Sequence, residues 1–364
     1  MRDYYQETTK HADGQQAING ITAAALMEKI FPEPRWAIPG ILPEGLNLLA
    51  GKPKKGKSIF ALNIGLSIAL GGLALGKIPV EQGAVIYLAL EDTERRLQKR
   101  IKQMMPDSGA PDALFLFTKW PRMDAGGLEL LEAKISEIPN LRLVIIDTLQ
   151  KFRKPSKSNG NLYAEDYETV SKIKDVADRL GVCILLIHHL RKAESDDIFD
   201  TLSGSLGLTG GADGNLVMEN VRGNTTLHIT GRDVEGIELA IELDGRLLAW
   251  RLLGERAEVQ ATNERQILYD AIKNADGEVT PHELSEITGL KSHYIRKNLP
   301  VLLQDRTIKK VDRGKYIFIG YIRDNGDNGD NGHKGNNGNN YSLGTIVPRT
   351  DSPGTMPGTM QSQQ

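Results

Sequence analysis

The sequence predicts an α/β protein with a mostly parallel central sheet, followed by a small domain of three helices and a hairpin. Two observations carry this prediction. From residue 45 to about residue 253, short apolar runs alternate with segments of helical periodicity, which is typical of βαβ units. After residue 263, three short helical patterns precede two short strand-like runs, which is the plan of a winged helix.

Eight apolar runs are the candidate strands of the central sheet. They lie at residues 46–50, 84–90, 114–118, 143–146, 183–188, 214–218, 226–230 and 239–243. Helical patterns fill the gaps after the first five runs, for example at residues 93–105 and 164–180, so these strands are expected to be parallel. The last three runs follow one another closely and predict an antiparallel edge.

These patterns divide the chain into four parts. Residues 1–32 are polar with a short helix expected around residues 21–30, and residues 33–253 contain the alternating pattern. A polar linker near residues 254–263 leads into the predicted winged helix, residues 264–320. The tail, residues 324–364, opens on a repeated Asp-Asn-Gly unit and lacks the apolar side chains that offset chain entropy, so disorder is expected there.

Composition excludes several classes of protein. Charged residues make up 25% and hydrophobic residues 40% of the 364 residues, as in a soluble globular protein. The net charge of −2 means that any nucleic-acid surface must be local. The single cysteine, Cys183, rules out a disulfide within one chain and is expected to be buried. The chain shows no signal-peptide pattern and no run that would span a bilayer, so a cytoplasmic protein without membrane contact is expected.

Residues 51–58 form a complete Walker A sequence between a candidate strand and a candidate helix. The expected phosphate-binding residues are Gly51, Pro53, Lys54, Lys55, Gly56, Lys57 and Ser58. A strand, a Gly-rich turn and a helix N-terminus place backbone N–H groups around a polyphosphate. In that arrangement Lys57 reaches the β- and γ-phosphates and Ser58 holds Mg²⁺. The chain is therefore expected to bind a nucleoside triphosphate.

Three further strand ends carry polar residues. Asp147 ends an apolar run in the form of a Walker B element and is expected to hold Mg²⁺, partly through water. Glu91 is placed to polarise the water that attacks the γ-phosphate, whereas the adjacent Asp92 is expected to cap the next helix. Adjacent His188 and His189 point to opposite faces of a strand and make a poor metal site. His188 is predicted to sense the γ-phosphate, with a half-buried structural histidine as the alternative.

The order of these motifs resembles that of the RecA-like P-loop ATPases. It runs from Walker A through Glu91, Asp147 and the histidine pair to the Ser-Gly-Ser sequence at residues 203–205. More narrowly, residues 39–45 and 230–235 resemble the RepA-type hexameric replicative helicases of plasmids, phages and mobile elements, which are AAA-family ATPases. The resemblance covers residues 33–253 and implies a RecA-like core that uses ATP and Mg²⁺.

The resemblance also implies roles for individual residues. Glu91 matches the catalytic glutamate, Asp147 the Walker B aspartate and His188 the sensor, where helicases of the DnaB type usually carry glutamine. Arg232 falls on the strand that supplies an arginine or lysine finger to the neighbouring subunit, and Arg222 is the alternative finger. A plain surface arginine is the alternative for each of these two residues. Because such a finger acts in trans, the chain is expected to form a ring or a filament, by analogy a hexamer.

Basic residues on two loops and one helix are the candidate nucleic-acid contacts. The expected residues are Lys151, Arg153, Lys154 and Lys157 after Walker B, Arg191 and Lys192 after the histidine pair, and Arg296 and Lys297 on the recognition helix of the winged helix. The loops would contact single-stranded DNA in the ring channel, and the winged helix would contact duplex DNA. Solvated surface is the alternative for the loops, and protein docking is the alternative for the winged helix.

Two functions are consistent with these features. The first is a ring-forming, ATP-dependent DNA helicase or translocase that acts on single-stranded DNA in replication. The second is a DNA-stimulated ATPase without helicase activity, acting as a recombination mediator, loader or regulator. A small-molecule kinase is disfavoured, because no pattern indicates a lid or a second substrate pocket.

Overall fold

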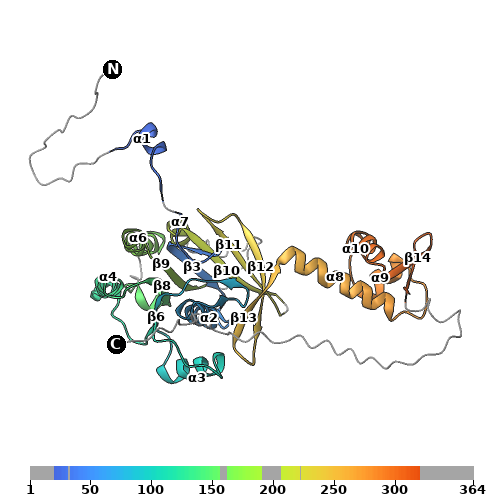
Figure 1. The fold of residues 1–364 in the computed structure, drawn as a ribbon, viewed down its shortest axis with the longest axis horizontal. Coiled ribbons are helices and arrows are strands. Elements are labelled where there is room, and N and C mark those ends of the chain that lie inside the picture. The colour runs from blue at the N-terminus through green and yellow to red at the C-terminus, as the bar shows by residue number, and fades with distance from the viewer. Residues whose placement is uncertain (1–19, 32, 156–161, 191–205, 222, 320–364) are drawn as a thin grey trace, which may run out of the picture. The chain divides into compact units, whose positions relative to one another are not determined.

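The computed structural model describes residues 20–31, 33–155, 162–190, 206–221 and 223–319 (Figure 1). Contacts divide the chain into two units, residues 1–35 and residues 36–364. In the first unit, α1 (Ala23–Met27) begins after Thr22, whose hydroxyl accepts a hydrogen bond from the N–H of Ala25. This helix is shorter than the one predicted at residues 21–30, and none of its residues is buried.

The second unit contains a nine-stranded sheet in the order β13-β12-β11-β10-β3-β9-β8-β6-β7. Its strands are β3 (Gly45–Gly51), β6 (Ala84–Ala89), β7 (Leu114–Phe117), β8 (Leu141–Asp147), β9 (Cys183–His189), β10 (Gly214–Val221), β11 (Asn224–Gly231), β12 (Ile237–Asp244) and β13 (Ala249–Glu255). The strands from β10 to β7 are parallel, and β11, β12 and β13 pair antiparallel at one edge. The predicted parallel sheet with an antiparallel edge is confirmed.

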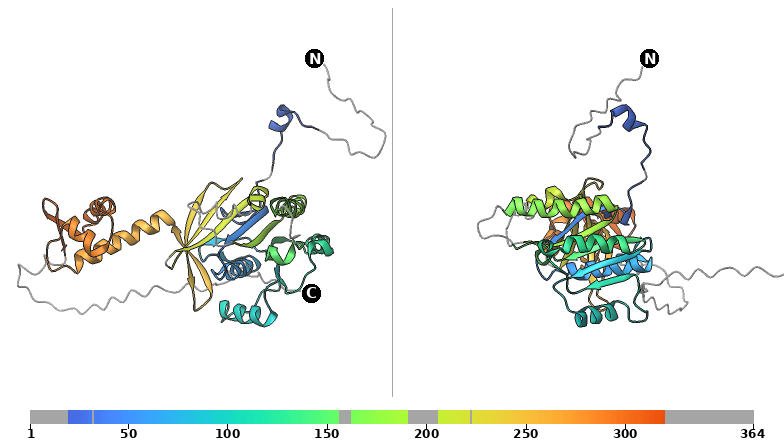
Figure 2. Two further views of the ribbon diagram at one scale, coloured as in Figure 1. Left: turned by 180° about the vertical axis from the view of Figure 1, so that it is seen from behind. Right: turned by 90° about the vertical axis from the view of Figure 1, so that its left-hand side faces the viewer.

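Helices cover both faces of this sheet (Figure 2). On one face, α2 (Lys57–Leu70) and α3 (Glu94–Met104) pack in a core that includes Leu49. On the other face, α4 (Gly127–Glu137), α5 (Leu149–Phe152), α6 (Leu162–Leu180) and α7 (Leu206–Gly211) pack in a core that includes Leu46 and Leu48. Because β3 is buried on both faces, its sequence is mostly apolar rather than alternating, with Asn47 as a buried polar residue.

Short elements connect the main ones. They are β1 (Trp36–Ile38), β2 (Leu42–Pro43), β4 (Leu73–Ala74), β5 (Ile78–Pro79) and the 3₁₀ helix η1 (Met123–Ala125). Cys183 is buried at the start of β9, as predicted. Within the described residues, no helix combines the length and the apolar character that crossing a membrane requires.

The C-terminal region contains α8 (Arg256–Lys273), α9 (Pro281–Thr288), α10 (Ser292–Gln304), β14 (Ile308–Asp312) and β15 (Lys315–Phe318). These elements share a core of their own, built from Leu268, Ile272, Leu284, Ile295, Leu299 and Ile308 among others. Helix α9 begins at a capping box, in which the Thr280 hydroxyl and the Glu283 carboxylate each accept a hydrogen bond from the other residue's backbone N–H. Three helices and a hairpin occur in the order that the sequence predicts.

The predicted polar linker at residues 254–263 is wrong. Strand β13 runs to Glu255 and α8 begins at Arg256, so this segment is the end of a strand and the first half of a helix. The buried residues of α8 are Glu264, Leu268 and Ile272, and none of them lies within the segment that was predicted to be a linker. Its first half has no apolar stripe, and without that stripe a helix has the sequence pattern of a linker.

Candidate active site

The phosphate-binding loop connects β3 to α2, as the Walker A sequence predicts. Lys54 and Gly56 have positive φ angles of 62° and 90°, which turn the chain back into the helix. Gly56 is the N-cap of α2 and provides no side-chain hydrogen bond to its first turn, so the N–H groups there are oriented to bind an anion. A Cβ atom on Gly51 would lie 2.7 Å from the carbonyl oxygen of Met218, so that position requires glycine.

Lys57 lies at the start of α2 and is only 3% exposed. Its Nζ donates hydrogen bonds to the carbonyl oxygens of Gly51 at 2.6 Å and Lys52 at 2.9 Å, both in the phosphate-binding loop. Burial lowers the pKa of Lys57 to about 8, against the opposing effect of the Asp147 and Glu91 charges. The ammonium group is thus held inside the loop, where a triphosphate would replace the carbonyl partners.

Asp147 ends β8 and is 5% exposed. One carboxylate oxygen accepts a hydrogen bond of 2.9 Å from the Tyr87 hydroxyl, and Ser58 is a second hydrogen-bond partner. Burial raises the pKa of Asp147, and the hydrogen bonds with Ser58 and Tyr87 oppose that shift. A hydroxyl and a carboxylate side by side are oxygen ligands of the kind that Mg²⁺ prefers, so Ser58 and Asp147 fit the predicted metal site.

Glu91 follows β6, and side chains from two other segments contact its carboxylate. The Thr148 hydroxyl donates to Oε1 at 3.1 Å, and Nε2 of His189 lies 3.5 Å from Oε2. Thr148 directly follows β8, and His189 is the last residue of β9. The Glu91 side chain keeps 42% of its surface exposed. A carboxylate that is fixed on both oxygens yet open to solvent can orient an attacking water molecule.

The sequence analysis did not predict that His189, rather than His188, contacts Glu91. In the register of β9 with β3, His188 lies opposite Ala50 and His189 opposite Gly51, where the phosphate-binding loop begins. His189 therefore contacts Glu91, and neighbouring residues of a strand point to opposite faces. The assignment of His188 as the sensor stays a prediction. The order of strands β6, β8 and β9 in the sheet would have been needed to choose between the two histidines.

Asp92 has a structural role, although it is not itself the helix cap. Thr93 is the N-cap of α3 and accepts a hydrogen bond from the N–H of Arg96. The Asp92 carboxylate accepts from the N–H of Thr93 and pairs with Arg96 and Arg100. These partners hold Asp92 beside α3, and Glu91 is left as the carboxylate that faces Thr148 and His189.

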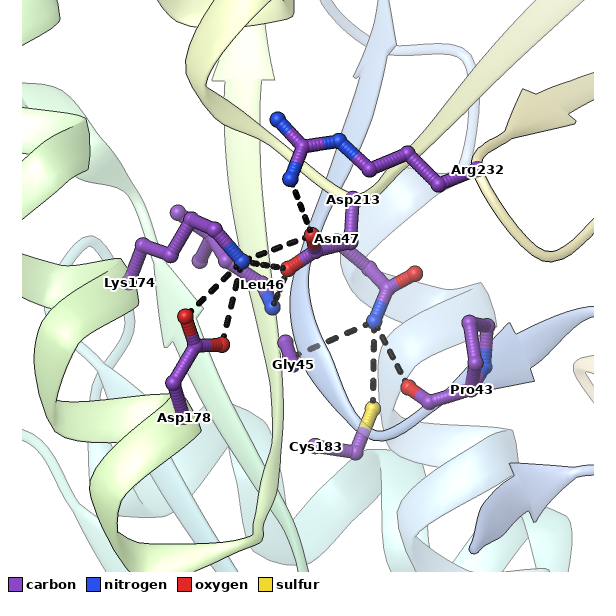
Figure 3. A network of polar contacts seen from close by, with 9 residues as sticks. All are labelled: Pro43, Gly45, Leu46, Asn47, Lys174, Asp178, Cys183, Asp213 and Arg232. Atoms are coloured by element: carbon purple, nitrogen blue, oxygen red, sulfur yellow. Dashed lines mark hydrogen bonds and ion pairs between the residues drawn. The ribbon is translucent and has the colours of Figure 1, made fainter. Parts of the chain in front are cut away.

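Arg232 lies directly after β11. It is at the amino-terminal end of the parallel strands, whereas the phosphate-binding loop lies at their carboxyl-terminal end. Gly231 pairs with Gly214, and Gly214 pairs with Asn47 at the beginning of β3. Four strand residues, about 13 Å, separate Asn47 from Gly51 at the other end. Arg232 is 62% exposed and is 3.4 Å from Asp213 (Figure 3). The alternative finger, residue 222, lies outside the described residues.

The candidate nucleic-acid contacts differ in accessibility. Lys151 is exposed on α5, whereas Arg153 is 12% exposed and forms an ion pair with the buried Asp166, which leaves it a poor phosphate ligand in this conformation. Lys154 pairs with Glu168 at 3.0 Å and remains 42% exposed. Both Arg296 and Lys297 are exposed on α10. The predictions for Lys157, Arg191 and Lys192 fall outside the described residues.

Part of the chain matches a known protein family. Residues 15–195 match the family described as "AAA domain", and this segment carries Lys57, Glu91, Asp147 and His189. The match confirms the broader resemblance to P-loop ATPases. The segment contains both halves of the site, the phosphate-binding loop and the three strand ends beside it.

Two similar solved structures have low sequence identity to this chain. The structure titled "ATPase Domain of G40P" is 17% identical, with a TM-score of 0.47 over 58% of this chain and 85% of that one. A DnaB-like replicative helicase, whose title mentions its interactions with primase, is 16% identical, with a TM-score of 0.46. That match covers 57% of this chain and 58% of the helicase chain, so this chain spans little more than half of that protein's length.

Proposed function

We propose that this chain, whose residues 15–195 match an AAA domain, is a RecA-like, ring-forming helicase or translocase driven by ATP on single-stranded DNA. The observation that carries this proposal is the placement of Arg232. It lies at the edge of the sheet opposite its own phosphate-binding loop and is largely exposed, so its guanidinium is available to the nucleotide of another subunit. An enzyme whose finger acts in trans must assemble into a ring or filament.

In the proposed reaction, ATP binds at the loop after β3. Lys57 would contact the β- and γ-phosphates, and Ser58 and Asp147 would hold Mg²⁺, which would supply positive charge that neutralises the phosphates. Glu91 orients the attacking water, with Thr148 and His189 fixing its carboxylate. His189 is well placed to report the state of the γ-phosphate, because it contacts Glu91 and lies beside Gly51. Arg232 of a neighbouring subunit stabilises charge on the transferred phosphoryl group.

We also propose that residues 33–253 are the ATPase domain and residues 264–320 a winged helix that binds duplex DNA. The three helices and hairpin with their own core support this assignment, as do the exposed Arg296 and Lys297 on α10. Replacing both residues by alanine should weaken duplex binding and flatten its salt dependence, because each lost phosphate contact lowers the slope by about one. Unchanged binding would favour a protein-docking role.

The experiment that tests the main proposal measures ATP hydrolysis by the full chain with Mg²⁺, with and without a single-stranded oligodeoxynucleotide. A Lys57→Ala variant controls for contaminating ATPases. Stimulation by DNA, followed by strand displacement on a forked duplex, is the expected result. Stimulation without strand displacement would favour the mediator or loader function instead. Hydrolysis that does not respond to DNA would contradict both.

A further inference from the structure

Asp213 is a buried carboxylate at the start of β10, outside the nucleotide site (Figure 3). Its Oδ2 accepts a hydrogen bond of 3.0 Å from the N–H of Leu46. Its own N–H donates to the carbonyl oxygen of Leu46 at 2.8 Å. Lys174 Nζ, on α6, lies 2.6 Å from both carboxylate oxygens. Asp213 is thus fixed to the first residues of β3 and to a helix on one face of the sheet.

Arg232 contacts Asp213 through both its backbone and its side chain. Its N–H donates to the carbonyl oxygen of Asp213 at 2.9 Å, and its Nη1 lies 3.4 Å from Oδ1 of the carboxylate. The backbone bond fixes where the side chain begins. The longer side-chain contact and the 62% exposure leave the guanidinium able to move to a stronger anion.

The free energy needed to move the Arg232 guanidinium away from Asp213 depends on Lys174. The Lys174 side chain is 19% exposed and also pairs with Asp178 at 3.0 Å. Burial alone would lower the pKa of Lys174, but hydrogen bonds with Asp213 and Asp178 raise it, so the amine stays charged. A buried carboxylate that loses its last cation is strongly destabilised. Because Lys174 remains on both oxygens, Asp213 keeps a counter-ion when the Arg232 guanidinium leaves.

We propose that Asp213 is the positioning residue for Arg232. Asp213 holds the guanidinium at the sheet edge that faces a second copy of the chain, and Lys174 is the permanent counter-ion that lets the guanidinium transfer to the phosphate of that copy. The inference rests on the proposed function, in which Arg232 acts in trans. It adds Asp213 and Lys174 to the residues on which hydrolysis depends, although neither touches the nucleotide.

A double-mutant cycle in the full chain tests this proposal. ATP hydrolysis with Mg²⁺ and single-stranded DNA is compared for the parent chain, Asp213→Asn, Arg232→Ala and the combination. Asp213→Asn should lower kcat on the order of tenfold, the scale on which one charge-assisted contact changes a rate. KM for ATP should stay within about twofold, because the phosphate-binding loop lies at the other edge of the sheet. In the Arg232→Ala background, Asp213→Asn should have no further effect.

Asp178→Asn is the matched control. The substitution removes the other carboxylate partner of Lys174. Asp178 is 51% exposed, and in the part of the chain that the structure describes it has no contact with Arg232. We expect parental kcat and KM for this variant. Thermal unfolding of every variant, followed by circular dichroism, separates loss of the fold from loss of positioning.

The outcomes distinguish this inference from the function on which it rests. A slow Arg232→Ala variant with a fully active Asp213→Asn variant would overturn the positioning role alone. So would an Asp213→Asn defect that persists at full size in the Arg232→Ala background, because that defect would be structural. A fully active Arg232→Ala variant would overturn the finger itself, and the inference with it.

If Asp213→Asn does not fold, Lys174→Gln carries the test. Arg232 would then be the remaining cation on Asp213 among the residues described, and it should be held more tightly. We expect a lower kcat at unchanged KM for ATP, and the defect should disappear in the Arg232→Ala background. An unchanged kcat in a folded Lys174→Gln variant would overturn the proposal.

Discussion

At the residue scale, the candidate base Glu91 depends on the two side chains that contact it. Thr148 and His189 come from segments after β8 and at the end of β9, and each contacts a different oxygen of the carboxylate. The polar strand ends could be predicted, because the carboxyl ends of parallel strands are where an α/β sheet places its ligand-binding residues. The pairing of Glu91 with His189 could not, because it depends on strand order and register.

Substitution of the two histidines should separate their roles. His189→Asn removes the contact with Glu91, so we expect kcat for ATP hydrolysis to fall on the order of tenfold or more, with ATP affinity little changed. His188→Asn is the comparison variant, since it changes the adjacent side chain on the other face of β9. The measurement is steady-state hydrolysis together with equilibrium binding of ATP. A larger kcat defect in His188→Asn would restore the original sensor assignment.

The single cysteine reports on the integrity of the sheet. Cys183 is 2% exposed, and burial raises the pKa of its thiol well above the usual range. Because the thiolate is the reactive form, iodoacetamide at pH 8 should not label the native protein. The same reagent should label the chain stoichiometrically in guanidinium chloride, which can be followed by mass spectrometry. Rapid labelling of the native protein would show that β9 is not buried between β3 and β8.

At the element scale, β13 is joined to the phosphate-binding loop through α2. The backbone N–H of Trp250 donates to Asn63 Oδ1 at 2.7 Å, and the Asn63 amide donates to the carbonyl oxygen of Leu248 at 3.0 Å. The Trp250 indole N–H donates to the carbonyl oxygen of Gly56 at 3.3 Å. Because α8 begins directly after β13, this edge strand connects the loop with the C-terminal helices.

Trp250→Phe should test that connection with little loss of packing. The substitution keeps an aromatic ring in a site that is 4% exposed but removes the hydrogen bond to Gly56. One lost hydrogen bond changes a free energy by about 1 kcal/mol. We expect ATP affinity to fall by a few-fold, measured by fluorescent-nucleotide titration, with a small decrease in thermal stability. Trp36→Phe, on β1, is the tryptophan control and should bind ATP normally. Parental affinity in Trp250→Phe would mean that the bond does not shape the loop.

Most strands of the sheet could be predicted from the sequence, whereas the edge strand β13 and the start of α8 could not. Runs such as that of β3 are mostly apolar because both of their faces are buried, and their short length between glycines separates them from a buried helix such as α2. Strand β13 and the first half of α8 are mixed in polarity because much of their surface is exposed. The local sequence pattern then carries little information about secondary structure, and β13 is a strand because it pairs with β12.

At the scale of the whole molecule, the residues of the proposed mechanism lie at the two opposite ends of the strands of one sheet. The carboxyl ends of β3, β6, β8 and β9 carry the phosphate-binding loop and the residues around Glu91. The opposite edge carries Arg232 and its partner Asp213. In one chain these groups cannot meet across the sheet. An assembly in which the Arg232 side of one subunit faces the nucleotide side of the next would complete the site, and such head-to-tail contacts form rings where the rotation closes and filaments where it does not.

The most direct test of this account mixes two impaired variants. Lys57→Ala disables the phosphate-binding loop but retains Arg232, and Arg232→Ala does the reverse. With single-stranded DNA present, Lys57→Ala alone should hydrolyse ATP at background rate, and Arg232→Ala alone should keep only a small residual rate above it. If the finger acts in trans, mixed assemblies contain interfaces with an intact loop from one variant and an intact arginine from the other, and hydrolysis returns. No recovery on mixing, under conditions where the variants exchange subunits, would contradict the account.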